Sequence, residues 1–189
     1  MALRVVVLAS GTGSLLQALI DAQDSNFEIV ALITDQPDAG AIGRAAVAGI
    51  QIAVLPVSDF ESRTAWNRAL ADAIEYYAAD LVVSAGFMRI VDETVVQQFS
   101  GRLINTHPAL LPSFPGARAV RDALAAGATT TGTTVHFIDA GVDTGEVIAQ
   151  VAVDVLPDDT EETLHERIKI AERQLLVDVV RDFALKNEG

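Results

Sequence analysis

The chain has no cysteine and only three histidines among its 189 residues. Without cysteine it can form neither disulfide bonds nor thiolate metal sites. The histidines, His107, His136 and His165, are too scattered to give the spacing of a metal-ligand motif. We therefore predict that the protein holds no structural or catalytic metal.

Positive charge is also scarce, because 13 lysines and arginines stand against 26 aspartates and glutamates, which gives a formal net charge of −13. Binding to nucleic acids depends largely on lysine and arginine side chains that neutralise phosphates. The composition therefore argues against a nucleic-acid-binding protein. A small anionic substrate is still compatible with it, provided that positive charge gathers locally at the site.

Long hydrophobic runs are absent as well. No stretch reaches the roughly 18 consecutive apolar residues of a membrane helix. The N-terminus enters strand-like sequence at residues 4–9 without a signal-peptide pattern. We predict a cytoplasmic protein without a membrane partner. With 50% hydrophobic residues the chain can bury a substantial core, so residues 1–189 are expected to form a single domain.

Strand and helix patterns alternate along the chain without repeats or a linker. This alternation predicts an α/β fold of three layers, with an open, mostly parallel sheet whose N-terminal half is Rossmann-like. Residues 133–138 and 147–153 are expected to add an antiparallel pair near the C-terminal end. The other strands are predicted at residues 4–9, 28–34, 81–85 and 102–105, and helices at residues 14–22, from 58 onward, at 117–127 and from 159 onward.

Two helix starts carry capping patterns. Ser58 and Glu61 are spaced as a capping box, and Trp66 is expected in the core behind the helix that this box begins. Asp159 and Glu162 are predicted to cap the final helix. The buried stripe of that helix is expected to comprise Leu164, Ile168, Ala171 and Leu175.

Asn105 and His107 stand two residues apart, just after a predicted strand and just before Pro108. A residue before proline is pushed toward extended geometry, so the His107 ring should point across from Asn105 at the C-terminal end of that strand, where open α/β sheets bind ligands. An amide and an imidazole together can stabilise an oxyanion and move a proton beside it. The alternative, which the pair alone leaves open, is two buried polar groups that satisfy loop backbone.

A second segment, residues 132–148, favours the functional interpretation. It predicts a strand with Thr134 and His136 on one face, then a glycine-rich loop, then another strand. A carboxylate from that loop beside an imidazole would raise the pKa of the imidazole and fix its tautomer, as an acid–base histidine needs. Of the two loop carboxylates, we interpret Asp139 as a turn residue and Asp143 as the partner of His107.

The turn at residues 10–14, Ser-Gly-Thr-Gly-Ser, offers free backbone N–H groups and a positive helix end to a phosphate. It also matches the start of a dinucleotide fingerprint, with Asp35 ending the next strand about 20 residues later. The third glycine of that fingerprint is missing, because Leu16 stands where helix and strand approach closely. A non-catalytic NAD- or nucleotide-binding module is the alternative of a different class.

Taken together, these motifs resemble the formyltransferase family that uses 10-formyltetrahydrofolate. The family motif is an Asn, one residue, a His and a Leu-Leu-Pro turn, followed downstream by an Asp-x-Gly loop. The resemblance extends from the first strand to the last helix. It implies transfer of a formyl group from 10-formyltetrahydrofolate, as co-substrate, to the amine of 5′-phosphoribosylglycinamide in purine biosynthesis. The matching residues are Asn105-Thr106-His107, Leu110-Leu111-Pro112 and Asp143-Thr144-Gly145.

The resemblance also implies which residues act. It assigns catalysis to Asn105, His107 and Asp143, which Thr134 and His136 would support. A phosphate-binding half is expected at about residues 1–100, and a folate and catalytic half at about residues 101–189. Relatives often carry Asn where this chain has Leu15, so one contact to the nucleotide is expected to be missing. The nucleotide is expected at Thr12, Gly13, Ser14, Leu15 and Glu172, the last on the ribose hydroxyls, and the folate at Arg63, Met88, Arg89, Ile90, Val91 and Asn105.

Two alternatives stay open. A formyltetrahydrofolate hydrolase would use the same catalytic trio but pass the formyl group to water. Relatives of that kind usually carry an additional N-terminal domain, whereas this chain starts at its first strand. The non-catalytic binding module would leave Asn105, His107 and Asp143 unexplained. The expected partners are therefore glycinamide ribonucleotide and the folate, and the sequence leaves open whether the chain forms a homodimer.

Overall fold

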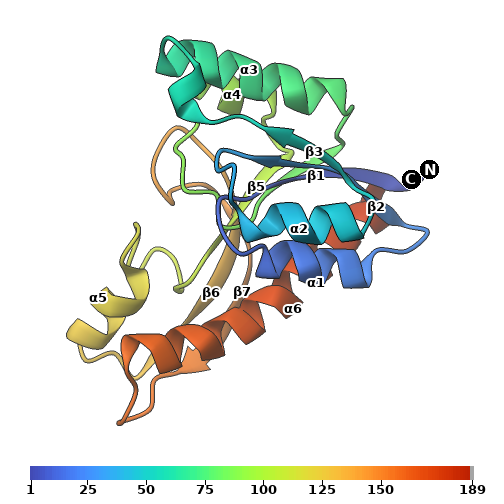
Figure 1. Ribbon diagram of the computed structural model, residues 1–189. Coiled ribbons are helices and arrows are strands. Elements are labelled where there is room, and N and C mark those ends of the chain that lie inside the picture. The colour runs from blue at the N-terminus through green and yellow to red at the C-terminus, as the bar shows by residue number, and fades with distance from the viewer. Residues whose placement is uncertain (188–189) are drawn as a thin grey trace.

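One seven-stranded sheet, in the order β3-β2-β1-β4-β5-β6-β7, organises the protein (Figure 1). It is seen in a computed structural model that describes residues 1–187. Neighbouring strands from β3 to β5 pair in parallel, and the pairs β5–β6 and β6–β7 are antiparallel. The predicted fold class is confirmed. The strands are β1 (Leu3–Leu8), β2 (Phe27–Thr34), β3 (Gln51–Val54), β4 (Leu81–Ser84), β5 (Leu103–His107), β6 (Thr130–Phe137) and β7 (Val147–Asp154).

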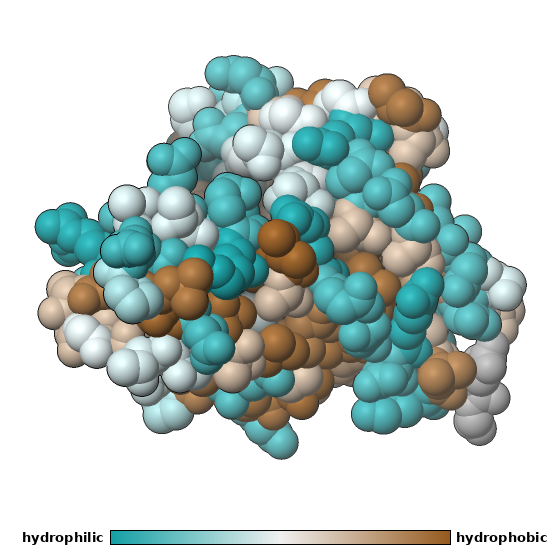
Figure 2. All heavy atoms as spheres, turned by 90° about the horizontal axis from the view of Figure 1, so that it is seen from below, coloured by the Kyte–Doolittle hydropathy of each residue, from teal (hydrophilic) through white to brown (hydrophobic). Residues whose placement is uncertain are grey.

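Helices cover both faces of the sheet. Figure 1 shows α3 and α4 on one face and α1, α2 and α6 on the other. Figure 2 views the molecule from the side of α1, α2 and α6, where hydrophobic residues gather near the middle among hydrophilic ones. The helices are α1 (Ser14–Ala22), α2 (Gly40–Val47), α3 (Arg63–Tyr76), α4 (Glu93–Gln98), α5 (Ala119–Ala125) and α6 (Glu161–Asn187), with a 3₁₀ turn η1 (Val57–Asp59).

The core has two main halves, one on each side of the sheet. Strands β1 and β4 are apolar almost throughout, as expected for parallel strands buried on both faces. On one face, Leu16 and Leu19 of α1 pack with Leu176 of α6. On the other, Trp66 and Leu70 of α3 are fully buried, so the core position predicted for Trp66 is confirmed.

The strand order reverses between β1 and β4. The chain leaves β1 through α1 toward β2, and it leaves β4 through α4 toward β5 on the opposite face. The loops that follow these two strands therefore leave the C-terminal edge of the sheet toward opposite faces, and open α/β sheets bind ligands at such a point. The loops in question are the turn at residues 10–14 and the segment at residues 86–91.

Some predicted boundaries differ from the structure. Helix α3 is capped by Ser62, whose hydroxyl accepts the Ala65 N–H at 3.1 Å, so the capping box predicted at Ser58 was wrong. At the start of α6, Thr160 and Thr163 form the reciprocal capping bonds. Asp159 instead binds Arg167 at 2.7 Å, so the cap predicted there was also wrong.

Candidate active site

Strand β5 sets the two polar side chains of the central motif on one face. It continues through His107, two residues further than predicted, so Asn105 and His107 are alternate residues of one strand. The antiparallel pairing places His136 opposite Asn105 and Thr134 opposite His107. These four polar side chains of β5 and β6 therefore share the same side of the sheet.

Asp143 reaches this cluster from the loop between β6 and β7. Its Oδ2 lies 3.4 Å from His107 Nδ1 and its Oδ1 lies 3.6 Å from His136 Nε2. The Gly116 N–H donates to Oδ2 at 2.7 Å. Asp143 has a φ of 54°, a left-handed conformation that is uncommon outside glycine and often marks functional loops.

Gly145 lets this loop close tightly against the sheet. A Cβ at Gly145 would lie 1.7 Å from the Phe137 carbonyl oxygen, so no larger residue fits without moving the backbone. Asp139 takes the turn role predicted for it, because it accepts the Gly141 N–H at 3.0 Å and the Thr144 hydroxyl at 2.7 Å. The Asp-x-Gly spacing thus fixes which of the two carboxylates faces the histidines.

His107 faces a hydrogen-bond acceptor with each ring nitrogen. Its Nε2 lies 2.7 Å from the Phe114 carbonyl oxygen, and its Nδ1 faces Asp143. A carbonyl and a carboxylate only accept, so both ring nitrogens are satisfied when both carry protons. This arrangement suits an imidazolium that can supply a proton or a charged hydrogen bond.

His136 is held as a neutral ring. Its Nδ1–H donates to the Phe137 carbonyl at 2.8 Å, and its Nε2 lies 3.3 Å from Asn105 Nδ2. Burial lowers the pKa of His136, against the opposing effects of the Phe137 carbonyl and Asp143, so the neutral ring accepts one Asn105 N–H. The second N–H of the Asn105 amide is then left for a ligand.

Thr134 supports the turn that follows β5. Its hydroxyl donates to the Ala109 carbonyl at 2.6 Å and accepts the Leu111 N–H at 3.1 Å. Gln150 of β7 donates to both Thr134 Oγ1 and the Leu111 carbonyl. The Leu-Leu-Pro turn is therefore tied to the sheet beside His107.

In the turn at residues 10–14, Gly13 directly precedes the first residue of α1 and has a φ of 74°. A Cβ there would lie 2.7 Å from Ala41 Cα, so only glycine fits. No side chain caps α1, which leaves the N–H groups of its first turn for a ligand. Arg44 of α2 fixes the turn by donating to the Thr12 carbonyl at 2.8 Å.

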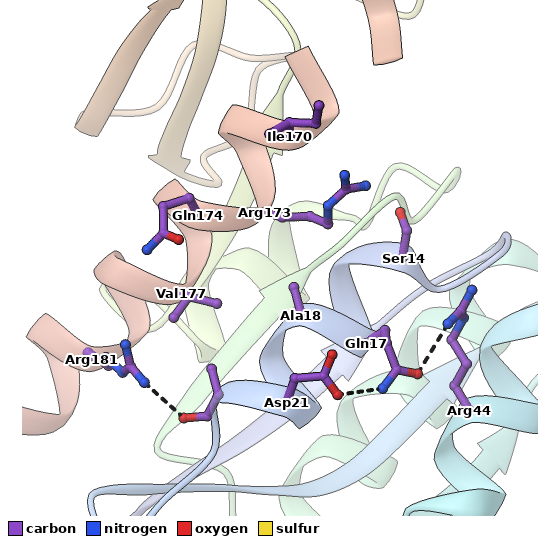
Figure 3. A pocket seen from close by; sticks show the side chains of 11 residues that line it. Ser14, Gln17, Ala18, Asp21, Arg44, Ile170, Arg173, Gln174, Val177 and Arg181 are labelled. Carbon is purple, nitrogen blue, oxygen red and sulfur yellow. Dashed lines mark hydrogen bonds between the residues drawn. The ribbon is translucent and has the colours of Figure 1, made fainter. Parts of the chain in front are cut away.

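A cavity of about 630 Å³ lies between α1 and α6, and Ser14 is at one end of it (Figure 3). Three arginines line it, so positive charge gathers here in an acidic protein. Arg44 and Arg181 donate to backbone carbonyls, those of Thr12 and Ala22. In Figure 3 the Arg173 side chain extends from α6 toward Ser14.

Glu172 precedes Arg173 on α6 and is buried, with 7% of its surface exposed. Burial raises the pKa of Glu172, although a hydrogen bond with Thr106 and the nearby Lys169 and Arg173 act in the other direction. Thr106 lies between Asn105 and His107, so it points to the other face of β5. The strand therefore links the histidine cluster on one face to Glu172 on the other.

The segment at residues 86–91 has an exposed apolar rim, in which Met88 is 76% and Ile90 70% exposed, while Val91 is buried. Arg63 of α3 donates to the Ile90 carbonyl at 2.7 Å and lies over the Trp66 ring. The Arg89 Nε donates to Asp35 at 2.6 Å. Both arginines thus hold this segment in place.

Comparisons with known proteins agree with this geometry. Residues 3–180 match the formyl transferase family. Phosphoribosylglycinamide formyltransferase of Mycobacterium tuberculosis (strain H37Rv) is 51% identical over 183 residues, which cover 96% of this chain and 85% of that protein. The chain belongs to the formyl transferase family. The family resemblance drawn from the sequence is confirmed.

Two other members of the formyl transferase family are similar to this chain over nearly its whole length. The Escherichia coli (strain K12) protein named phosphoribosylglycinamide formyltransferase is 42% identical over 185 residues, covering 96% of this chain and 87% of that protein. The crystal structure of glycinamide ribonucleotide transformylase 1 from Symbiobacterium toebii has a TM-score of 0.95 at 40% identity, covering 98% of this chain and 89% of that chain. Both matches include every element that carries the site.

The sequence analysis did not single out Arg173 or Asp35 for the site of this formyl transferase family member. Arg173 was missed, although its place beside Glu172 on one helix could have drawn notice. Asp35 was considered only as a ribose ligand of NAD, yet its side chain is fully buried and bound to Ser10, Gln36 and Arg89. A carboxylate with these partners is not presented to a ribose.

Neither a metal cluster nor a membrane span appears in the part of the chain that the structure describes. Among residues 1–187, no group of three or more histidine, cysteine or acidic side chains is arranged to hold a metal ion. No helix in the same range is both long and apolar enough to cross a membrane.

Proposed function

We propose that this formyltransferase transfers the formyl group of 10-formyltetrahydrofolate to the amine of 5′-phosphoribosylglycinamide, which yields formylglycinamide ribonucleotide and tetrahydrofolate in purine biosynthesis. The observation that carries the proposal is the cluster of Asn105, His107 and Asp143, which lies at the C-terminal edge of the sheet where the strand order reverses. The names of the relatives support the same reaction. The two substrates are the partners, and one domain holds both.

The nucleotide binds along α1 and α6 in this proposal. Its phosphate takes the free N–H groups at the start of α1, near Thr12, Gly13 and Ser14, and Arg173 from across the cavity. Leu15 contributes only its backbone, since its side chain is buried and apolar. Glu172 accepts the ribose hydroxyls, for which a carboxylate offers two oxygens.

The folate binds against the other loop. The exposed apolar side chains of Met88 and Ile90 face its ring system, together with backbone groups as far as Val91. Arg63 and Arg89 bring positive charge to its anionic tail. The formyl carbon then lies between the segment at residues 86–91 and Asn105.

The reaction proceeds by direct attack of the neutral amine on the formyl carbon. The new C–N bond forms as the carbonyl π electrons move to oxygen, and the Asn105 N–H that His136 leaves free stabilises this oxyanion. His107 supplies the second donor, for which its Nε2–H exchanges the Phe114 carbonyl for the oxyanion. Collapse of the intermediate breaks the bond to N10 of the folate.

Asp143 completes the proton balance. Its Oδ2 faces Nδ1 of His107 at 3.4 Å, and in this scheme it stands beside the amine that must lose a proton. That proton travels through water near Asp143 to N10 of the departing tetrahydrofolate. No covalent enzyme intermediate forms, and the enzyme ends in the protonation state in which it began.

The test is a spectrophotometric assay of folate product from a stable 10-formyl folate analogue, with and without glycinamide ribonucleotide. Product should form only when the nucleotide is present. Asn105→Ala and Asp143→Ala should each lower kcat by about 10²–10³-fold, the usual loss for an oxyanion donor or its support. Asp139→Asn is the matched control, because its turn bonds can persist and it makes no contact with His107.

Two results would contradict the proposal. Formate release that does not require the nucleotide would indicate a hydrolase. Near-normal kcat in Asn105→Ala and Asp143→Ala, in protein whose circular dichroism is unchanged, would remove these residues from the chemistry.

A further inference from the structure

Asp35 follows β2 and is the most enclosed carboxylate at this edge of the sheet. Its side chain has no exposed surface. The Ser10 hydroxyl donates to Oδ1 at 2.5 Å, and Gln36 and Arg89 donate to Oδ2 at 2.9 and 2.6 Å. Both oxygens are therefore fully used by the protein, and none is left for a ligand.

These bonds connect the turn at residues 10–14 to the segment at residues 86–91. Ser10, which donates to Asp35, accepts the Met88 N–H at 2.9 Å, and the Ser10 N–H donates to the Gly86 carbonyl at 3.1 Å. Arg89 binds Asp35 directly. Asp35 thus holds two neighbouring residues of the segment at residues 86–91. It holds the Met88 backbone through Ser10, and it binds the Arg89 side chain directly.

The charge of Asp35 is balanced inside the protein. Burial alone would raise the pKa of Asp35, but the hydrogen bonds from Ser10, Arg89 and Gln36 outweigh it and keep the pKa below its ordinary value. A buried carboxylate without such partners would be costly. The ion pair with Arg89 is therefore part of how this edge of the sheet holds together.

The ion pair also decides how Arg89 is presented. A guanidinium has five N–H donors, and Asp35 takes the one on Nε. No other hydrogen bond of Arg89 occurs within residues 1–187. The edge formed by the two terminal nitrogens is then free for a carboxylate, which guanidinium binds through two parallel bonds.

We propose that Asp35 is a positioning residue for the folate: it fixes the Arg89 guanidinium and the Met88 amide so that the segment at residues 86–91 is preformed for an anionic, carboxylate-bearing ligand. The inference rests on the proposed function for the identity of that ligand. It assigns Asp35 no contact with either substrate, so Asp35 acts through its neighbours.

The test compares Asp35→Asn with Asp38→Asn. Both remove one negative charge from the same loop, but Asp38 is exposed and makes no hydrogen bond to Ser10, Asp35 or Arg89. Asp35→Asn should raise the KM for the folate about tenfold, as expected for the loss of a charged hydrogen bond. The KM for the nucleotide and kcat should stay within about twofold, and Asp38→Asn should leave all three constants unchanged.

A double-mutant cycle with Arg89→Ala tests whether Asp35 acts through Arg89. In the Arg89→Ala background, Asp35→Asn should add less than about twofold to the folate KM, because the group that it positions is gone. Additive effects would overturn the proposal. An equal rise in the KM values of both substrates would also overturn it, since that is what general damage to this edge of the sheet would produce.

Ser10→Ala is a second, milder variant in case Asp35→Asn does not fold. It removes only the link from Asp35 to the Met88 amide, and it should raise the folate KM without changing the nucleotide KM. Calorimetric titration with the 10-formyl folate analogue separates this inference from the reaction. Tight binding that weakens about tenfold in Asp35→Asn supports positioning even if no formyl transfer is observed, whereas unchanged binding overturns it.

Discussion

Arg173 lines the cavity, and its side chain extends from α6 toward Ser14 at the start of α1 (Figure 3). A phosphate at that helix start carries charge that backbone N–H groups only partly balance. We therefore expect Arg173→Ala to raise the KM for glycinamide ribonucleotide about tenfold and to leave the folate KM unchanged, since a charged hydrogen bond to phosphate is typically worth that much. Steady-state kinetics with each substrate varied in turn measures both constants.

Arg181→Ala is the matched control for this prediction. It removes the same charge from the same cavity, but the Arg181 guanidinium donates to the Ala22 carbonyl at the C-terminal end of α1. It should leave the nucleotide KM within about twofold. If the two variants raise this KM equally, the effect is one of overall charge, and the specific role of Arg173 fails.

At the level of single residues, the sequence predicted the polar pair at the end of β5 and its partner Asp143. Asn105 and His107 were found because they follow a strand and because Pro108 keeps His107 extended, and Asp143 was found from the glycine-rich loop that carries it. Arg173 and Asp35 escaped because their roles depend on which helix or loop packs opposite them. No local spacing in the chain encodes that the end of β2 meets the segment that follows β4.

Among the elements, the turn between β1 and α1 depends on Gly13. A side chain there would be strained by the φ of 74° and would press against the Cα of Ala41 in α2. We expect Gly13→Ala to lower the free energy of unfolding by at least about 1–2 kcal/mol, the cost of a left-handed conformation for alanine. It should also weaken nucleotide binding. Urea denaturation and calorimetric titration measure the two effects.

Gly11→Ala, in the same turn, supplies the comparison. A Cβ at Gly11 would meet nothing within 4 Å, and its φ is not among the positive values. The free energy of unfolding of Gly11→Ala should stay within about 0.5 kcal/mol of that of the parent protein, as for most surface substitutions. Equal losses in both variants would show that the turn does not rely on the tight approach of α1 and α2.

Element types were easier to predict than element ends. Continuous apolar runs identified the buried strands, and alternation of strands and helices identified the parallel sheet. Ser58 and Asp159 have the residue types of helix caps but take other partners, because Ser62 and Thr160 are better placed for the first N–H groups. Several residues in each stretch could cap, and tertiary packing selects among them.

For the whole molecule, the reversal of strand order between β1 and β4 explains why one edge of the sheet carries the site. The loops after β1 and β4 lead to opposite faces there, and β5 adds the polar cluster beside them. Two buried groups with shifted pKa values lie at or next to β5. Burial lowers the pKa of His136, while burial raises the pKa of Glu172.

These two shifts make opposite contributions to the pH dependence of stability. His136 binds its proton less readily in the folded than in the unfolded protein, so its contribution is present above its ordinary pKa of 6.5 and is lost as the pH falls. Glu172 holds its proton more readily in the folded protein. Its contribution is present below its ordinary pKa of 4.5 and is lost as the pH rises through its higher folded value.

Replacing Glu172 with glutamine should therefore remove the pH dependence of stability that Glu172 contributes. Glu172→Gln keeps the shape of the side chain without a charge to bury, so its stability relative to the parent should improve as the pH rises above about 4.5, by at most about 1.4 kcal/mol per pH unit, and then level off. Urea denaturation across pH 4 to 8 measures the difference. Glu162→Gln, an exposed change on the same helix, should show no such trend. A difference between Glu172→Gln and the parent that is the same at every pH would mean that Glu172 holds no extra proton in the fold, and that its buried place beside Thr106 suits the ionised form already.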